Sequence, residues 1–319
     1  MVGSAPESAV ALSASGLTKR FGEREAVSAL TLSIGTGRAF GLLGPNGAGK
    51  TTTVRLLTGL LAATRGEVTL LGERLTPATA DRLRSRIGVQ TDTELYLSLS
   101  VRDNLRYWGE LYGLSAGRIA RRTGDVLDGL GLAGRIDSPV GELSKGMRQK
   151  LSVGRAILHE PELLFLDEPT AGLDPEASED LIALLKGMIR HAHTTVVMCT
   201  HQLHGLETLC DDIGVLIGGR LAACGEVSQL LRERWPRTRY EIEIQGNPDA
   251  ARQTIGAVVN GLVETDPAGR IHFSIAEGQS VATVVSELVT RGVPITAVVP
   301  EQPTIQDLYF ATIAEGVLT

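Results

Sequence analysis

The chain has 319 residues, of which 43% are hydrophobic and 21% are charged, and its formal net charge at pH 7 is −6. This composition is typical of a globular protein long enough for two domains. The acidic balance, without a block of like charges, argues against a protein that coats nucleic acid. No run reaches the roughly 18 consecutive apolar residues of a membrane-spanning helix. The three cysteines show no pairing pattern, which indicates reduced thiols.

The first 36 residues contain a polar start and then two strand-like runs. Residues 1–12 are rich in Ser and Ala and have neither a basic start nor a long apolar core, so we expect a flexible tail and not a signal peptide. Residues 13–36 hold two short alternating runs around Leu17–Gly22, which predict a pair of antiparallel strands.

The most informative stretch follows the apolar run Phe40–Leu43. It fits the pattern G-x-x-x-x-G-K-[ST] at each fixed position, and helical spacing of apolar residues begins just after it, as a phosphate-binding loop requires. The chain has five lysines against 26 arginines, and this scarcity argues against a chance lysine at this position of the pattern. We expect a nucleoside triphosphate to bind the loop, namely Gly44, Pro45, Asn46, Gly47, Ala48, Gly49, Lys50, Thr51 and Thr52.

Each part of this loop has a physical task. Glycines let the backbone wrap around phosphates with its N–H groups inward, where side chains would collide with the ligand. The helix that starts near Lys50 directs its unpaired N–H groups and its positive dipole end at the same anion. The Lys50 ammonium adds a full charge between the β- and γ-phosphates, and the Thr51 hydroxyl can be a ligand of Mg²⁺.

Strand and helix patterns alternate after the loop. Val68–Leu71 reads as a short strand, and apolar residues recur at helical spacing through residues 98–135. Leu163–Leu166 is a bare apolar run, typical of a buried parallel strand, and a helix at residues 176–191 and a strand at Thr195–Cys199 follow it. This order predicts a parallel α/β sheet with a helical insertion.

Two acidic residues end the run Leu163–Leu166. Asp167 falls at the carboxyl end of its strand, where open α/β sheets bind ligands, and it can hold Mg²⁺ directly or through water. Glu168 points elsewhere and can polarise the attacking water as a general base. The alternative is a strand that ends in a solvated acidic turn, which the phosphate loop upstream disfavours.

A change of composition near residues 232–237 suggests a second domain. Strand and helix patterns then follow in the order β-α-β-β-α-β, with a final helix at 305–314. This order predicts a split βαβ module of about eighty residues. The predicted elements are the strands 240–244, 260–265, 270–275 and 295–299 and the helices 248–258 and 280–290.

The segment between the two motifs, Leu143-Ser144-Lys145-Gly146-Met147-Arg148-Gln149-Lys150, is similar to the LSGGQ signature of ABC-transporter nucleotide-binding subunits. The chain resembles this family over residues 13–235. Lys145 and Met147 depart from the common form, whereas Ser144 and Gly146, which the resemblance places at a γ-phosphate, are kept. Alone, the segment is also a Ser-capped helix start. The resemblance assigns nucleotide contacts to Leu143, Ser144, Lys145 and Gly146.

Other family elements match single positions. The stretch Ala171–Asp174 resembles the D-loop, which places Asp174 near the nucleotide. His201 resembles the switch histidine that contacts the γ-phosphate. Phe21 stands where the family has an aromatic residue that stacks on adenine, although a single aromatic side chain can also be part of the core.

Two residues are candidates for the functional position of the Q-loop. Ile87–Val89 looks like the strand that leads into it. Residue identity favours Gln90, whereas family spacing points nearer to Asp92. Either side chain could relay contacts to Mg²⁺ and the attacking water.

The resemblance implies an ABC ATPase: an α/β P-loop fold with an antiparallel β subdomain and a helical subdomain at about residues 98–150. It implies a nucleotide-binding domain at 13–236 and an accessory α+β domain at 237–319. ATP and Mg²⁺ are the implied cofactors. Glu168 and His201 are the implied catalytic residues, and the metal contacts are Thr51, Asp167 and Gln90.

The resemblance also implies partners. Two such subunits sandwich two ATP molecules at the cytoplasmic face of the cell membrane and drive a separate membrane permease, with no nucleic acid bound. A homodimer is expected, and a pair of different chains is the alternative. The alternative is a soluble ABC ATPase of nucleic-acid maintenance or translation. The segment Pro303–Tyr309 and the LSKGMRQK wording are similar to exporters of the daunorubicin-resistance type. The C-terminal module is then either a ligand-sensing regulator or a cap that stabilises the dimer or is purely structural.

Overall fold

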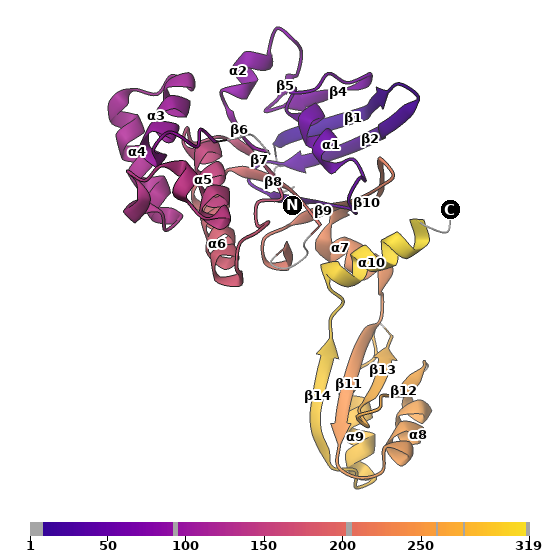
Figure 1. Cartoon of the computed structure of the whole chain (residues 1–319). Coiled ribbons are helices and arrows are strands. Elements are labelled where there is room, and N and C mark those ends of the chain that lie inside the picture. The colour runs from indigo at the N-terminus through magenta and orange to yellow at the C-terminus, as the bar shows by residue number, and fades with distance from the viewer. Residues whose placement is uncertain (1–8, 92–94, 202–205, 260, 277, 317–319) are drawn as a thin grey trace, which may run out of the picture. The chain divides into compact units, whose positions relative to one another are not determined.

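The computed structural model describes residues 9–91, 95–201, 206–259, 261–276 and 278–316 (Figure 1). The chain divides into two compact units, one of Met1–Val227 with Tyr309–Thr319 and one of Ser228–Leu308. The predicted boundary at 236/237 lies a few residues beyond the first of these divisions. Among the described residues, no helix is both long enough and apolar enough to cross a membrane.

An antiparallel sheet opens the first unit, with the strand order β2-β1-β4-β5. Strand β1 begins at Val10, so residues 10–12, which we expected in the flexible tail, belong to the sheet. Ala11 and Leu12 are both buried, and Leu12 pairs with Ile34, so the burial of these apolar side chains extends the strand further toward the N-terminus than predicted. The strands are β1 (Val10–Phe21), β2 (Arg24–Gly35), β4 (Arg65–Leu70) and β5 (Glu73–Arg74).

A six-stranded sheet follows, with the order β10-β9-β3-β8-β7-β6. All its neighbouring pairs are parallel except β10 with β9. Every residue of β3, β7 and β8 is buried, as the bare apolar runs predict for central parallel strands. The strands are β3 (Ala39–Leu43), β6 (Ile87–Gln90), β7 (Leu163–Asp167), β8 (Thr195–Thr200), β9 (Asp212–Ile217) and β10 (Arg220–Glu226).

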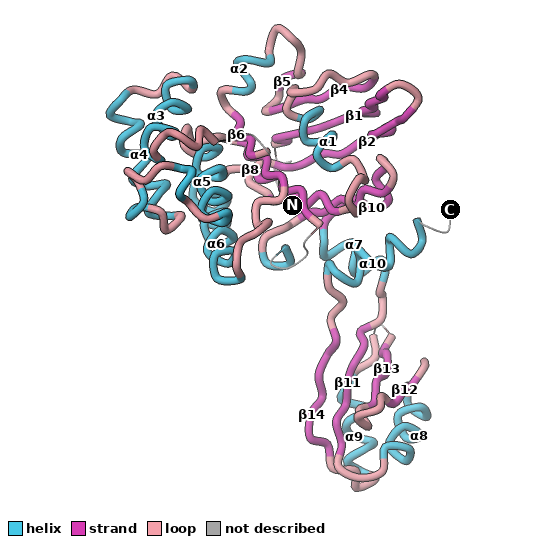
Figure 2. Tube along the Cα trace, in the orientation of Figure 1, coloured by secondary structure: helices cyan, strands magenta, loops and turns pink. Residues whose placement is uncertain are grey.

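Helices α3 and α4 lie in the predicted helical insertion at 98–135, whereas α5 begins within the predicted helical subdomain at 98–150 and continues to Ile157 (Figure 2). Strands β9 and β10 and helices α2 and α7 were not predicted from the sequence. The helices of the first unit are α1 (Lys50–Leu57), α2 (Ala80–Arg84), α3 (Val101–Leu111), α4 (Ala116–Gly129), α5 (Lys145–Ile157) and α6 (Pro175–Ala192). The division between the units falls within α7 (Val227–Arg234) and within α10 (Ile305–Gly316). Short 3₁₀ turns span Ala133–Arg135, Val140–Glu142 and Leu206–Thr208.

The strand order decides where the motifs meet. Strand β3 lies beside β8, and β8 lies beside β7. Since parallel strands end at the same edge of a sheet, the segments after β3, β7 and β8 converge there. These segments are the glycine-rich loop, the acidic pair and Thr200–His201.

The second unit contains the predicted split βαβ order, with all strands antiparallel in the sequence β12-β13-β11-β14. Helices α8 and α9 pack on one face of this sheet, where Ile255 and Leu288 meet Phe273 in one buried cluster. The elements are β11 (Thr238–Ile244), α8 (Pro248–Val258), β12 (Val263–Thr265), β13 (Ile271–Ile275), α9 (Val281–Thr290) and β14 (Ile295–Glu301).

A buried histidine follows helix α5. The Nε2 atom of His159 lies 3.0 Å from the carbonyl oxygen of Ile87, and its ring stacks on Tyr112 at a centroid distance of 3.7 Å. Because a carbonyl can only accept, Nε2 carries the proton, and the buried Nδ1 has no hydrogen-bond partner within the described structure. Burial lowers the pKa of His159 from 6.5 to about 4.

This histidine predicts a pH dependence of stability. Between pH 6.5 and about 4 the unfolded chain binds a proton that the folded chain does not, so stability falls as the pH drops through this window. At pH 5 the loss from this one group is about 2 kcal/mol. We expect His159→Gln to reduce the difference between the urea unfolding midpoints at pH 7.5 and pH 5. An unchanged difference would assign the pH dependence to other groups.

Candidate nucleotide site

The glycine-rich loop joins the buried strand β3 to helix α1. Gly49 precedes the helix in the left-handed region, with φ 105°, and no side chain caps the first turn. The first N–H groups of a helix have no partner within it and carry its positive dipole end. The loop therefore presents amide groups to an anion, as the sequence predicts.

Two different constraints favour glycine in this loop, which are crowding by backbone atoms and a left-handed backbone conformation. A Cβ atom at Gly44 would lie 2.4 Å from the carbonyl oxygen of Leu216, and one at Gly49 would lie 2.5 Å from that of Ala26. Both positions are thus fixed by the protein's own backbone. Gly47 has φ 79° and open space around it, so its conformation, and not crowding by the protein, favours glycine.

This contrast predicts unequal effects on stability. We expect Gly44→Ala to cost about 3 kcal/mol, because the added methyl group meets the backbone of β9, which cannot move alone. Gly47→Ala meets no atom and should cost about 1 kcal/mol, for its left-handed conformation only. Denaturant unfolding of the two variants measures this. Equal losses would mean that contact with the strand does not determine the residue at position 44.

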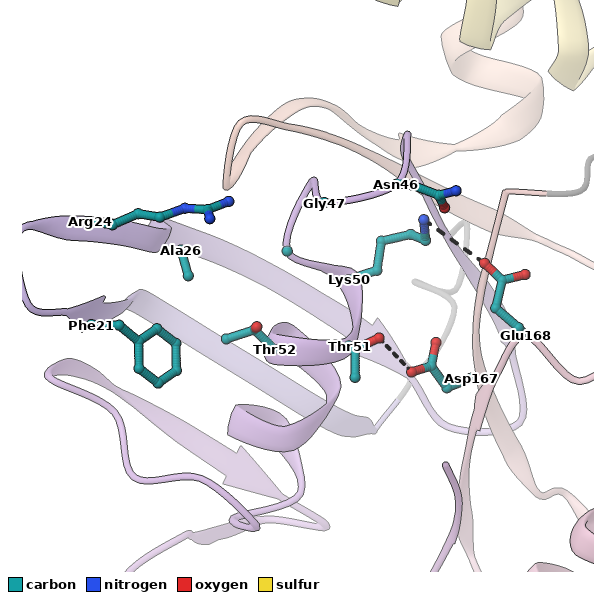
Figure 3. Close-up of a pocket in the computed structure, with 11 residues that line it drawn as sticks. Phe21, Arg24, Ala26, Asn46, Gly47, Lys50, Thr51, Thr52, Asp167 and Glu168 are labelled. Carbon is teal, nitrogen blue, oxygen red and sulfur yellow. Dashed lines mark hydrogen bonds and ion pairs between the residues drawn. The ribbon is translucent and has the colours of Figure 1, made fainter. Parts of the chain in front are cut away.

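Lys50 is buried at the centre of the site. Its Nζ donates to the carbonyl oxygens of Gly44, at 2.7 Å, and Pro45, at 3.3 Å, and it lies 3.9 Å from Oε1 of Glu168 (Figure 3). The ammonium group is therefore held between the loop and the acidic end of β7.

A hydrogen-bonded chain connects the loop to β7 and β6. The Thr51 hydroxyl donates to Oδ2 of Asp167 at 2.7 Å (Figure 3), and the amide of Asp167 donates to Oε1 of Gln90 at 3.1 Å. Gln90 is buried and does not line the cavity, and this hydrogen bond connects it to Asp167, which does. Asp92, the other Q-loop candidate, lies outside the described residues.

Glu168 is held in place by the next strand. Its backbone is in the left-handed region, with φ 51°, which is strained for a residue with a side chain. Its amide donates to Cys199, and its carboxylate accepts from the Thr200 hydroxyl at 2.9 Å. The His201 amide and Nδ1 lie 3.1 and 2.7 Å from Oε1. Glu168 and His201, both predicted as catalytic, are therefore in direct contact.

Gln149 supports the same turn from helix α5. Its Nε2 donates to the carbonyl oxygens of Glu168, at 2.9 Å, and Pro169, at 3.1 Å. The prediction did not give Gln149 a role, although it belongs to the segment that resembles the signature. Its amide could have been noticed there as a donor for a neighbouring turn.

Phe21 lies at the far end of the cavity from Asp167 and Glu168 (Figure 3). Its side chain is 52% exposed, so it is not a core residue, and the Nζ of Lys19 lies 5.2 Å from its ring centre. Arg24 and Ala26 of β2 also line this end, and the prediction missed both because only the folded hairpin brings them near the loop.

The cavity has a volume of about 450 Å³, within the usual range for small-molecule sites. Nine of the predicted residues line it: Phe21, Asn46, Gly47, Gly49, Lys50, Thr51, Thr52, Asp167 and Glu168. Gly44, Pro45 and Ala48 lie in the loop but do not line the cavity.

The signature-like residues do not line this cavity. Ser144 caps α5 by accepting from the Met147 amide at 3.2 Å, and Asp174 caps α6 by accepting from the Ala177 amide at 2.8 Å. Leu143 is buried and Lys145 is exposed. A Cβ atom at Gly146 would lie 3.3 Å from the Leu173 side chain, so α5 starts close to the D-loop segment.

A phosphate-binding loop after one parallel strand that faces the acidic end of another strand of the same sheet defines a P-loop nucleotide-binding protein. A family model described as "ABC transporter" matches residues 27–171. A relative also matches most of the chain at 30% identity. The chain belongs to the ATP-binding subunits of ABC transporters: it binds ATP and is an ATPase. The predicted fold is thereby confirmed.

Two relatives cover nearly the whole chain. The linearmycin resistance ATP-binding protein LnrL of Bacillus subtilis is 30% identical over 302 residues, which are 93% of this chain and 96% of that protein. The Nod factor export ATP-binding protein I of Ralstonia nicotianae is 35% identical over 301 residues, covering 93% and 92%. A solved ATP-binding subunit of an ABC transporter superposes with a TM-score of 0.64 at 31% identity, covering 70% of this chain and 92% of that one.

Proposed function

We propose that this chain powers the export of a drug-like or other lipophilic small molecule through a separate membrane subunit, in a system of the daunorubicin-resistance type. The observation that supports this is the extent of the similarity to two proteins named for resistance and export. It covers 93% of the chain, so it continues beyond residue 237 into the C-terminal module. The module is thus a shared feature, and we place it at 237–319, after a nucleotide-binding domain at 13–236.

The layout of the cavity supports one orientation of ATP. Phe21 offers an aromatic face for adenine at one end, and Asp167 and Glu168 lie at the other (Figure 3). Between them, the first turn of α1 and the Lys50 ammonium fit a triphosphate. We therefore place the γ-phosphate at Glu168.

Mg²⁺ fits the oxygen atoms at this end. Thr51 Oγ1 and Asp167 Oδ2 lie 2.7 Å apart, close to the roughly 3 Å that separates neighbouring ligands of an octahedral Mg²⁺. We propose these two as its protein contacts, and Gln90 as the residue that positions Asp167. When bound, Mg²⁺ supplies charge that neutralises the phosphate oxygens.

Glu168 is the proposed general base for the attacking water. Its carboxylate is fixed by Thr200 and His201, so it is oriented before a water arrives. The water loses its proton to Glu168 as its oxygen bonds to the γ-phosphorus and the bond to ADP breaks. His201, in contact with Glu168, is the proposed γ-phosphate contact from the same chain.

Five residues are proposed to contact the ATP that is bound to a second subunit: Leu143, Ser144, Lys145, Gly146 and Asp174. They lie away from the chain's own cavity, and Ser144 and Gly146 are at the N-terminus of α5, which favours an anion. Two copies arranged head to tail would place each helix over the ATP of the partner. We propose a homodimer, bound to a permease at the cytoplasmic face of the membrane and without nucleic acid.

Reconstitution tests the proposal. The chain is co-expressed with the membrane protein encoded beside it, and inside-out vesicles are assayed for ATP-dependent uptake of a lipophilic dye. We expect uptake, and its loss with Lys50→Ala. Purification of the chain with ribosomes or DNA, and without a membrane-spanning partner, would overturn the proposal in favour of the alternative of nucleic-acid maintenance or translation.

A further inference from the structure

The turn from Glu168 to Pro169 has an unfavourable backbone conformation. Glu168 is in the left-handed region, with φ 51°, and it also precedes a proline, a position that favours extended conformations. Such a conformation persists only where surrounding contacts hold it. Because Glu168 lines the ATP cavity and points toward Lys50 (Figure 3), contacts that hold this turn also orient the carboxylate.

The side-chain amide of Gln149 holds two consecutive peptide groups of this turn. Its Nε2 donates to the carbonyl oxygens of Glu168, at 2.9 Å, and Pro169, at 3.1 Å. A primary amide has two N–H groups, so one can serve each carbonyl. The proline ring already fixes φ at residue 169. The orientation of the two carbonyl groups therefore sets ψ at both residues, and Gln149 determines that orientation.

The start of helix α5 packs closely against the continuation of the same turn. A Cβ atom at Gly146 would lie 3.3 Å from the Leu173 side chain and 3.4 Å from the carbonyl oxygen of Gly172. A Cβ atom at Gly172 would in turn lie 3.1 Å from Cε of Lys145. Since packed groups transmit displacements, a shift of the start of α5 would reach residues 168–173.

Helix α5 also connects the turn to the proposed second subunit. Ser144 caps the helix, and Gln149 follows five residues later in the same uninterrupted helix, about 7.5 Å along its axis. In the head-to-tail dimer proposed above, Ser144 contacts the ATP of the partner. One rigid element would therefore contact the partner's ATP at its N-terminus and the turn of Glu168 through Gln149.

We propose that Gln149 is a positioning residue that couples the two ATP sites of the dimer. ATP on the second subunit restrains the start of α5, and the two hydrogen bonds of Gln149 pass this restraint to the turn. The Glu168 carboxylate of the same chain is then held toward its attacking water, so ATP in one site favours hydrolysis in the other. This inference rests on the proposed dimer and on Glu168 as the base.

Gln149→Glu in the full-length chain tests the coupling. The new carboxylate has nearly the same size, but it can only accept, so it loses both hydrogen bonds and repels the two carbonyl groups. We expect kcat to fall about 10–100-fold, as misplaced catalytic groups do, and the Hill coefficient for ATP to fall from about 2 toward 1. Gln149 does not line the cavity, so binding of a fluorescent ATP analogue should stay within twofold.

Three further variants separate positioning from a general effect on the fold. Gln149→Lys retains a donor for both carbonyl groups, so it should keep kcat within about fivefold and keep the Hill coefficient. Gln149→Met has a similar size without donors or charge, so it should behave like Gln149→Glu and replaces that variant if a half-buried carboxylate prevents folding. Gln253→Glu is the matched control, because Gln253 is exposed on α8 and does not line the cavity. Thermal unfolding checks each variant.

Two results would overturn the role of Gln149 alone. In the first, Gln149→Glu or Gln149→Met keeps the Hill coefficient of about 2 that the original chain shows. In the second, Gln149→Lys loses as much kcat as Gln149→Glu. A Hill coefficient near 1 in the original chain would instead contradict the two-site dimer, and the inference would fail together with that part of the proposed function.

Discussion

Replacing Glu168 by Gln is expected to lower ATP hydrolysis by about 10²–10⁴-fold while ATP binding persists. The amide keeps the shape of the side chain and can still accept from the His201 amide and donate to the Thr200 hydroxyl. It cannot take a proton from water. The bound γ-phosphate should then remain, and the closed dimer should accumulate. Phosphate release and size-exclusion chromatography with ATP measure the two effects.

Glu162→Gln is the matched control. Glu162 immediately precedes the same strand, β7, but it forms an exposed ion pair with Arg86 at 2.7 Å, and neither residue lines the cavity. The same chemical change there should leave hydrolysis unaltered, because exposed pairs contribute little to stability. Near-normal turnover in Glu168→Gln would remove Glu168 from the role of base.

Lys50→Ala should weaken ATP binding by at least about thirtyfold. A buried ammonium group that contacts phosphate contributes about 2 kcal/mol or more, and each 1.4 kcal/mol is a factor of ten. The variant also loses the hydrogen bond from Nζ to Gly44, so its folding must be checked by thermal unfolding. Equilibrium binding of a fluorescent ATP analogue gives the affinity.

Lys186→Ala controls for the loss of one positive charge. Lys186 is on helix α6 and does not line the cavity. Its removal should leave the affinity within about twofold, since Lys186 makes no contact with the space that the nucleotide is proposed to occupy. If Lys50→Ala bound ATP as tightly as this control, the assignment of the phosphate loop would be wrong.

Local chemistry explains which parts of the site could be predicted. The loop from Gly44 to Thr52 and the pair Asp167–Glu168 carry their function in consecutive residues, and the buried strands before them have an unambiguous apolar pattern. The order of strands and helices in the C-terminal module was predicted for the same reason.

Other features depend on contacts between distant segments. The need for glycine at 44 and 49 comes from carbonyl groups of β9 and β2, which no local pattern reveals. Strand β9 itself is a short apolar run with a glycine, for which periodicity does not separate strand from helix. The contacts of Gln149 and Thr200 with the Glu168 turn likewise exist only after folding.

The crowding at Gly44 and Gly49 has a consequence for affinity. Neighbouring strands already impose the curvature of the loop, so the loop is preorganised for the triphosphate before ATP binds. Little conformational entropy is then lost when ATP binds to the loop, so more of the binding free energy remains for the proposed closure of the dimer. Backbone NMR order parameters that are low in the loop without ATP and high with it would contradict this view.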